Sequence, residues 1–161
     1  MKRKKPQKIE KKEKKKGADV WGRGGDDWYY SDTVKEHFFN PKNILLDEPK
    51  EGDFDAEGEV GSVACGDVMK MWFKVDPETK KIKKLKWRTW GCASAIASTS
   101  VFSEMVTEKG GLTIDEALKI SPQEIMARLG GLPMIKVHCS VLADQAFKKA
   151  VEDYKEKRKG K

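Results

Sequence analysis

Three cysteines are the residues in this sequence best suited to chemistry: Cys65, Cys92 and Cys139. They cannot all pair within one chain, and their spacings match no local CxxC zinc or redox pattern. A carboxylate, Asp67, lies two residues after the first thiol, and an imidazole, His138, directly precedes the third. Thiolates select zinc or iron–sulfur clusters, and ligand type alone does not separate the two. These five residues therefore form a candidate metal or cluster site.

The ligand types also predict how firmly such a site would hold its cargo. A permanent ferredoxin-type centre normally has four cysteines, whereas three cysteines with a weaker oxygen or nitrogen ligand make a site that can release what it holds. Cys92 and Cys139 are expected at helix starts, which favour the thiolate, while Asp67 should disfavour it at Cys65. The alternative for each cysteine is a small buried hydrophobic residue. We interpret His37, with no thiol nearby in sequence, as an ordinary surface or packing histidine.

Strand patterns in the first half of the chain indicate the sheet that would position this site. Three strand-like runs lie near residues 55–63, 68–75 and 82–89. In the second run Met69, Met71 and Phe73 alternate with Lys70, Trp72 and Lys74, as in a strand with one buried face. The turn residues at 76–79 lead into the third run. The economical arrangement is a three-stranded antiparallel meander.

Helical patterns account for the rest of the domain. The predicted helices run from an N-cap at Ser31 to Phe39, from Cys92 to a stop at Gly110-Gly111, in two short pieces with capping boxes at Thr113 and Ser121, and from about Cys139 towards Lys155. The fold class is α+β, a three-stranded antiparallel sheet packed against several helices. All three cysteines then fall at element ends, where side chains from distant segments can converge. Trp87 and Trp90 are interpreted as packing residues.

The chain's positive charge is concentrated at its two ends. The net charge is +7, but residues 1–17 carry ten Lys or Arg against two Glu, and residues 154–161 carry five against one. Subtracting these +8 and +4 contributions leaves −5 for residues 18–153, so the body supplies no attractive field for phosphate. We expect a disordered basic tail and linker at 1–27, one domain at 28–155 and a basic tail at 156–161. The alternative is a tail that steers the chain to RNA or to an acidic partner.

Targeting signals and cysteine usage indicate the compartment. No run approaches the roughly 18 apolar residues of a membrane span, and the lysine-rich start lacks the apolar stretch of a secretory signal. Free thiols suit a reducing environment. We expect a soluble cytoplasmic protein that contacts no membrane and no nucleic acid.

Five ordered segments resemble the IscU family of iron–sulfur scaffold proteins, which also forms the N-terminal domain of NifU. The resemblance covers about residues 30–155, and its segments are Tyr30-Ser31-Asp32, Asn40-Pro41-Lys42-Asn43, Cys65-Gly66-Asp67, Thr89-Trp90-Gly91-Cys92 through Ser98, and Leu132-Pro133 through Lys136-Val137-His138-Cys139-Ser140. It implies that Cys65, Cys92 and Cys139 bind the cluster and that Asp67 or His138 completes the site. The cluster would be of the 2Fe-2S type, with 4Fe-4S as the alternative, and iron or zinc would bind in its absence.

The resemblance also implies a set of partners. A cysteine desulfurase would deliver sulfur to Cys139, whose thiolate is favoured by Lys136 and His138. An electron donor such as ferredoxin, apo iron–sulfur proteins as recipients, and a second copy in a homodimer complete the set. The chain itself would be a carrier and not an enzyme. Many members read Leu-Pro-Pro-Val-Lys where this chain has Leu132-Pro133-Met134-Ile135-Lys136, so the resemblance does not extend to chaperone-assisted release.

The related SufU proteins are the closest rival. They hold zinc at this position and accept sulfur from a desulfurase, but members of that branch typically lack the histidine that here is His138. Metal content after purification without air would separate the two functions.

Overall fold

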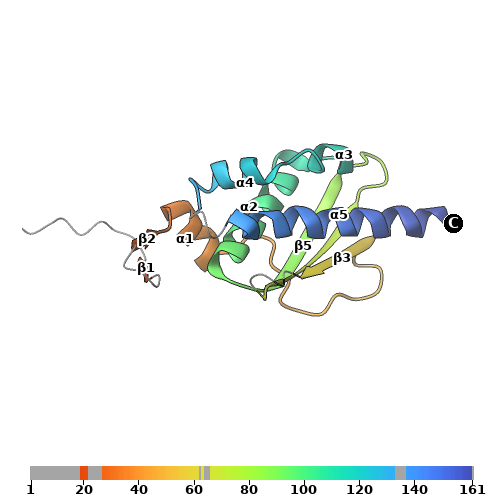
Figure 1. Ribbon diagram of the computed structural model, residues 1–161. Coiled ribbons are helices and arrows are strands. Elements are labelled where there is room, and N and C mark those ends of the chain that lie inside the picture. Colours follow the sequence, from red (N-terminus) through yellow and green to blue (C-terminus); the bar gives the residue numbers. More distant parts are fainter. Residues whose placement is uncertain (1–18, 22–26, 62, 64–65, 133–136, 161) are drawn as a thin grey trace, which may run out of the picture.

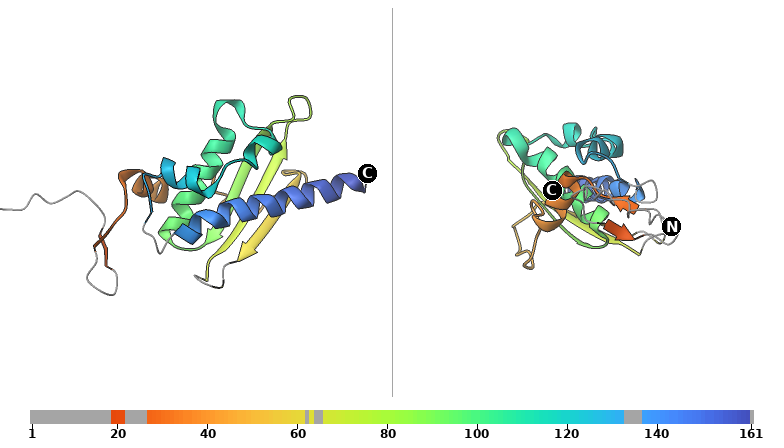
Figure 2. Two further views of the ribbon diagram at one scale, coloured as in Figure 1. Left: turned by 45° about the horizontal axis from the view of Figure 1, so that its top comes forward. Right: turned by 90° about the vertical axis from the view of Figure 1, so that its left-hand side faces the viewer.

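The computed structural model describes residues 19–21, 27–61, 63, 66–132 and 137–160, with the backbone alone at 19–21, 27–29 and 137–140. Its centre is a three-stranded antiparallel sheet in the order β3–β4–β5, formed by Ala56–Gly61, Val68–Val75 and Ile82–Trp90. Helices α2 (Ala93–Thr107) and α5 (Val137–Lys159) pack on one face of this sheet (Figures 1 and 2). The predicted α+β class and the meander are confirmed.

The inner face of the sheet carries the core. Met69, Met71 and Phe73 of β4 are fully buried, and their register partners on β5 are Thr89, Trp87 and Leu85. The β4–β5 turn is fixed by Asp76, whose Oδ1 accepts hydrogen bonds from the backbone N–H groups of residues 78 and 79, both at 2.9 Å. The alternation read from the sequence therefore places the core correctly.

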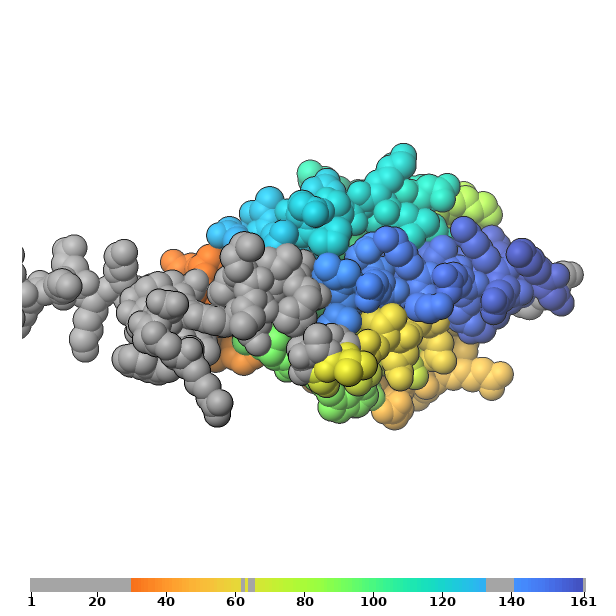
Figure 3. Space-filling model, viewed as in Figure 1, coloured from red at the N-terminus to blue at the C-terminus, as the bar shows by residue number. Residues whose placement is uncertain are grey.

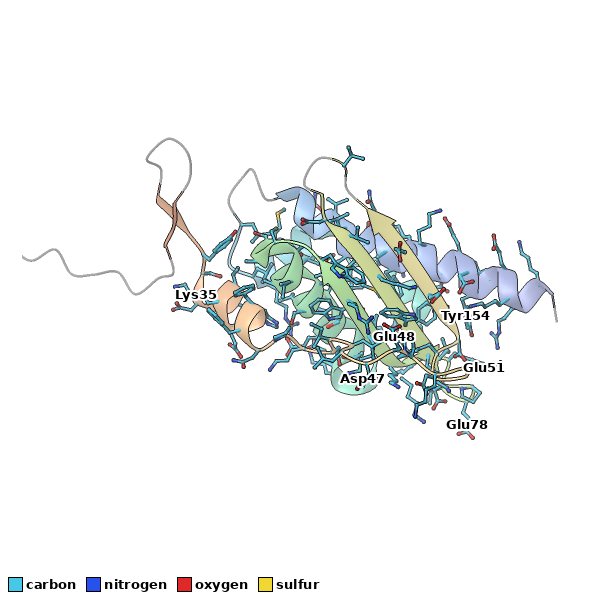
Figure 4. The ribbon with its side chains drawn as sticks, turned by 90° about the horizontal axis from the view of Figure 1, so that it is seen from below. Lys35, Asp47, Glu48, Glu51, Glu78 and Tyr154 are labelled. Carbon is cyan, nitrogen blue, oxygen red and sulfur yellow. The ribbon has the colours of Figure 1, made fainter. Side chains whose placement is uncertain are left out.

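The outer face of the sheet differs from the prediction, because Trp72 is only 4% exposed instead of facing solvent. The loop before β3 crosses this face, as the positions of Asp47, Glu48 and Glu51 show in Figure 4. Phe54 from that loop lies 6.3 Å from the Trp72 ring, and Trp72 Nε1 donates to Glu57 Oε2 at 3.0 Å. The loop before β3 has no periodic sequence pattern, so its packing over Trp72 could not be predicted.

Helix α1 (Asp32–Phe39) begins as predicted, since the Ser31 hydroxyl accepts a hydrogen bond from the Val34 N–H at 3.1 Å. His37 proves to be a packing residue, 6% exposed, with Nδ1 2.8 Å from Ser100 Oγ on α2. The same Oγ accepts from the Lys42 N–H at 2.7 Å, and Asn43 Nδ2 donates to Ser103 Oγ at 3.3 Å. The segment from α1 to residue 43 is thus held against α2 by polar side chains.

A short 3₁₀ helix, η1 (Glu108–Gly110), and two short helices, α3 (Ile114–Ala117) and α4 (Pro122–Arg128), follow α2. Both predicted capping boxes are present, with Glu116 reaching back to Thr113 and Glu124 to Ser121. Arg128 then ties α4 to η1 through a two-fold contact with Glu108, at 2.9 and 2.7 Å.

Helix α5 lies in the surface between α3–α4 and β3 (Figure 3) and extends further than predicted at both ends. Its last turn is supported by Lys157 paired with Asp153 at 2.7 Å and by the Arg158 guanidinium 4.9 Å from the Tyr154 ring. It approaches β3 at Gly58, where a Cβ would lie 2.2 Å from Ala150 N. Glycine is therefore required at this contact of strand and helix.

A two-stranded antiparallel ribbon, β1 (Asp19–Trp21) paired with β2 (Asp27–Tyr29), precedes α1. The sequence predicted a linker up to residue 27, so these short strands are additional structure. No helix in the described part of the chain is long and apolar enough to span a bilayer.

Candidate functional site

Antiparallel pairing of β4 and β5 brings Asp67 next to Cys92. Val68, the first residue of β4, pairs with Trp90, the last residue of β5. The residues that precede Val68 and follow Trp90 are therefore neighbours. The Thr89 hydroxyl donates to the Val68 carbonyl at 2.7 Å and secures the end of the pair. The Cys92 N–H then meets Asp67 Oδ2 at 3.4 Å. Two residues of the candidate site, far apart in the sequence, therefore lie next to each other.

Cys92 is the N-cap residue of α2, with extended backbone angles of φ −77° and ψ 170°. Its own side chain makes no capping hydrogen bond to the helix. The helix macrodipole favours negative charge at this end, which suits both the Asp67 carboxylate and a thiolate at Cys92. The predicted placement of Cys92 at a helix start is confirmed.

Gly91 creates the space in which the carboxylate lies. A Cβ at this position would be 3.0 Å from Asp67 Cγ and Oδ2, and 3.1 Å from Ala95 Cβ. Gly66, directly before Asp67, has φ +70°, a conformation that L side chains rarely adopt. Sequence reasoning missed the role of Gly91, and nothing in its local pattern indicates that a distant carboxylate lies against it.

Burial limits how Asp67 and Cys92 can be reached. Asp67 is 5% exposed, while Cys92 is partly buried. A carboxylate and a thiol on neighbouring residues are one hard and one soft candidate ligand for a metal ion.

The first turn of α5 brings a third segment to this end of the molecule. The backbones of His138 and Cys139 belong to this turn, and it lies at the same end as the start of α2 and the end of β5 (Figures 1 and 4). Cys65 and Lys136 lie outside the described residues, as do the side chains of His138 and Cys139. Among the side chains that are described, no three potential metal ligands form a group.

Tyr30 supports the start of α2 from the N-terminal side. Its hydroxyl is 2.9 Å from Ser94 Oγ in the first turn of α2, and Tyr30 is 8% exposed. Sequence reasoning did not assign this contact, although Tyr30 belongs to the first segment of the resemblance.

Two exposed hydrophobic residues lie at the same end. Trp90, which was expected to pack, is 59% exposed, and Val63 in the β3–β4 loop is fully exposed. Trp87, in contrast, is completely buried as expected, and its Nε1 donates to the Lys42 carbonyl at 2.8 Å. Strand alternation explains the difference, because residues 87 and 90 are an odd number of positions apart and face opposite sides of the sheet.

Comparisons with known proteins agree with this architecture. The family model described as "NifU-like N terminal domain" matches residues 29–161. The nitrogen fixation protein NifU of Trichormus azollae is 46% identical over 130 residues, covering 80% of this chain and 42% of that protein. The iron–sulfur cluster assembly scaffold protein IscU 1 of Archaeoglobus fulgidus is 45% identical over 125 residues, covering 78% of this chain and 76% of that protein.

A solved structure confirms the fold independently of the sequence similarity. The N-terminal part of a NifU-like protein from Brucella abortus has a TM-score of 0.58 at 22% identity, covering 79% of this chain and 94% of that one. The chain spans about two-fifths of the length of the NifU protein it matches. On the family match and the identity to the IscU relative, this chain belongs to the NifU-like N-terminal domain family.

Proposed function

We propose that this chain is a cytoplasmic scaffold on which an iron–sulfur cluster is assembled and from which the cluster passes to apo-proteins. The observation that carries the proposal is the meeting of Asp67 and Cys92 at the start of α2, with the first turn of α5 at the same end. The relatives named as NifU and IscU support the same assignment.

In this proposal Cys65, Cys92 and Cys139 bind the cluster through their thiolates. Asp67 or His138 supplies the fourth ligand, which is weaker and can exchange. A carboxylate that already lies against the α2 N-terminus has an alternative position to return to when it leaves the metal. This gives the site a route for release that a fourth cysteine would not provide.

Sulfur reaches the scaffold by thiol–persulfide exchange with a cysteine desulfurase. The Cys139 thiolate attacks the outer sulfur of the donor's persulfide, a new S–S bond forms on Cys139, and the donor leaves as a thiolate. Sulfur received in this way must be reduced to sulfide, so ferrous iron and an electron donor such as ferredoxin supply the electrons. The completed cluster is cargo, and its recipients are apo iron–sulfur proteins.

The test is anaerobic reconstitution with a cysteine desulfurase, L-cysteine and ferrous iron, followed by visible absorption and by iron, sulfide and zinc analysis. We expect a 2Fe-2S chromophore with equal iron and sulfide. Stoichiometric zinc with no chromophore would instead indicate a SufU-type sulfur acceptor.

Cys92→Ser is the informative variant for this test. Serine is a preferred N-cap residue, so the substitution preserves or strengthens the start of α2 while it removes a thiolate ligand. We expect an unchanged or higher unfolding midpoint together with loss of a stable chromophore. A variant that loads and retains the cluster like the original chain would refute the assignment of Cys92 as a ligand.

A further inference from the structure

Trp90, at the end of β5, is far more exposed than the other tryptophans of the sheet. It is 59% exposed, whereas Trp72 and Trp87 on the same sheet are 4% and 0% exposed. Its register partner is Val68, so the two form a cross-strand apolar pair on the outer face, where the end of the sheet meets the site. Val63, in the loop that follows β3, is also fully exposed.

The neighbours of this pair are cationic. One step further from the site on the same face, Lys70 lies opposite Arg88, and like charges directly opposite each other weaken a sheet. Lys70 approaches Glu57 at 3.6 Å and Glu59 at 3.9 Å, and Arg88 pairs with Glu48. The carbonyls of the loop before β3 also accept hydrogen bonds from Arg88. Carboxylates therefore already balance both cations, and the loop that covers Arg88 leaves Trp90 in solvent, so the end of the outer face is apolar.

The position of Trp90 relative to Cys92 decides which partner can cover it. At about 3.3 Å per residue of extended chain, the two residues lie within roughly 7 Å of each other. Reacting atoms must approach to about 3–3.5 Å for transfer between two proteins. Cys92 is partly buried, so a protein that brings a sulfur atom to this site must press against its rim, and Trp90 is on that rim.

We propose that Trp90 is the docking anchor for the sulfur-donor enzyme, which receives the indole in an apolar pocket. This inference rests on the proposed function. Tryptophan is the residue type most often found at the energetic centre of protein interfaces, because a large area is buried at little cost in side-chain entropy. The donor is favoured over a cluster recipient because its persulfide must reach the ligand thiols themselves for the sulfur bond to be exchanged.

The experiment compares Trp90→Thr with Phe39→Ala in the full chain. Threonine keeps the β-propensity of the strand end, so the fold should be maintained. Phe39 is the matched control, since it is 70% exposed and ends α1, against the Phe38 ring at 5.0 Å. The dissociation constant for the purified cysteine desulfurase of the same organism is measured by calorimetry, and loading with ferrous iron and inorganic sulfide is measured without the enzyme.

We expect Trp90→Thr to weaken desulfurase binding by about 30-fold or more, the range of an interface hot spot, and Phe39→Ala by less than about threefold. Both variants should load from inorganic sulfide like the original chain. Equal desulfurase affinities for Trp90→Thr and the original chain would overturn the inference, and so would weakened binding confined to an apo-ferredoxin recipient. Failure of the original chain to load from inorganic sulfide would instead refute the proposed function.

Discussion

Replacing Gly58 by alanine should destabilise the protein by moving α5 away from the sheet. The added Cβ would lie 2.2 Å from Ala150 N and 2.4 Å from Ala146 O. Both are backbone atoms, so no rotamer change can relieve the overlap. The distance to the nitrogen is about 1.3 Å short of the roughly 3.5 Å of a relaxed contact. The helix must therefore retreat by about 1 Å.

The free-energy cost follows from the side chains that α5 buries. A large buried side chain gains about 6 kcal/mol from dispersion contacts, and a gap of about 1 Å removes at least a quarter of this. Phe147 and Leu142, which are 0% and 2% exposed, then lose about 1.5 kcal/mol each. The expected loss of about 3 kcal/mol is a large share of the 5–15 kcal/mol that stabilises a typical domain.

Urea unfolding followed by circular dichroism measures this effect. With a slope near 2 kcal/mol per molar, the midpoint should fall by about 1.5 M. Gly61→Ala in the same strand is the control. Its Cβ would lie 3.9 Å from the Asp67 carbonyl oxygen and from Val68 Cγ2, which is an ordinary van der Waals distance. We expect that control to change stability by less than about 0.5 kcal/mol. Equal midpoints for the two variants would show that α5 does not approach β3 at Gly58.

Four further outcomes test the site and the polar contacts behind it. Gly91→Ala should displace the Asp67 carboxylate, because the new Cβ would lie 3.0 Å from it; faster hydrogen exchange at the first amides of α2 would report this, and unchanged exchange would contradict it. Asp67→Ala should lengthen the lifetime of the cluster and slow its transfer to apo-ferredoxin, since the weakest ligand is removed. A variant that transfers the cluster as fast as the original chain would refute this prediction. Cys139→Ser should abolish sulfur acceptance, and mass spectrometry after brief desulfurase treatment should find the added sulfur on Cys139 in the original chain and not on the other cysteines. Burial lowers the pKa of His37, so the folded state prefers the neutral imidazole. This contribution to stability is present above the ordinary pKa of about 6.5 and is lost as the pH falls below it. His37→Asn should therefore reduce the dependence of the unfolding midpoint on pH.

The sequence predicted those parts of the fold that short-range patterns determine. Alternation gave the inner face of β4, and the capping boxes at Thr113 and Ser121 gave the starts of α3 and α4. The burial of Trp72 could not be predicted, because it depends on a loop that contacts the sheet through Phe54 and has no periodicity of its own. Trp90 was misjudged because residue type suggested packing, whereas its strand position places it on the outer face.

The candidate site was predictable in its residue types but not in its internal contacts. Cys92 at a helix start followed from Gly91-Cys92 and the small residues after them, and the structure confirms it. The approach of Asp67 to the Cys92 N–H depends on the register of β4 and β5, which two isolated strand patterns do not define. The proposed roles of Cys65, Asp67, Cys92, His138 and Cys139 as ligands remain predictions.

The hydroxyl contacts along α2 also determine its orientation about its own axis. An apolar helix face can rotate or slide with little change in buried area, but hydrogen bonds are lost when their angles change. Tyr30 bonds Ser94, and His37 and the Lys42 N–H bond Ser100. Residues of one N-terminal segment therefore fix the rotation of α2 about its axis at two positions along the helix. Cys92 is rigidly joined to this helix, and its direction of projection is therefore determined as much by α1 as by the sheet.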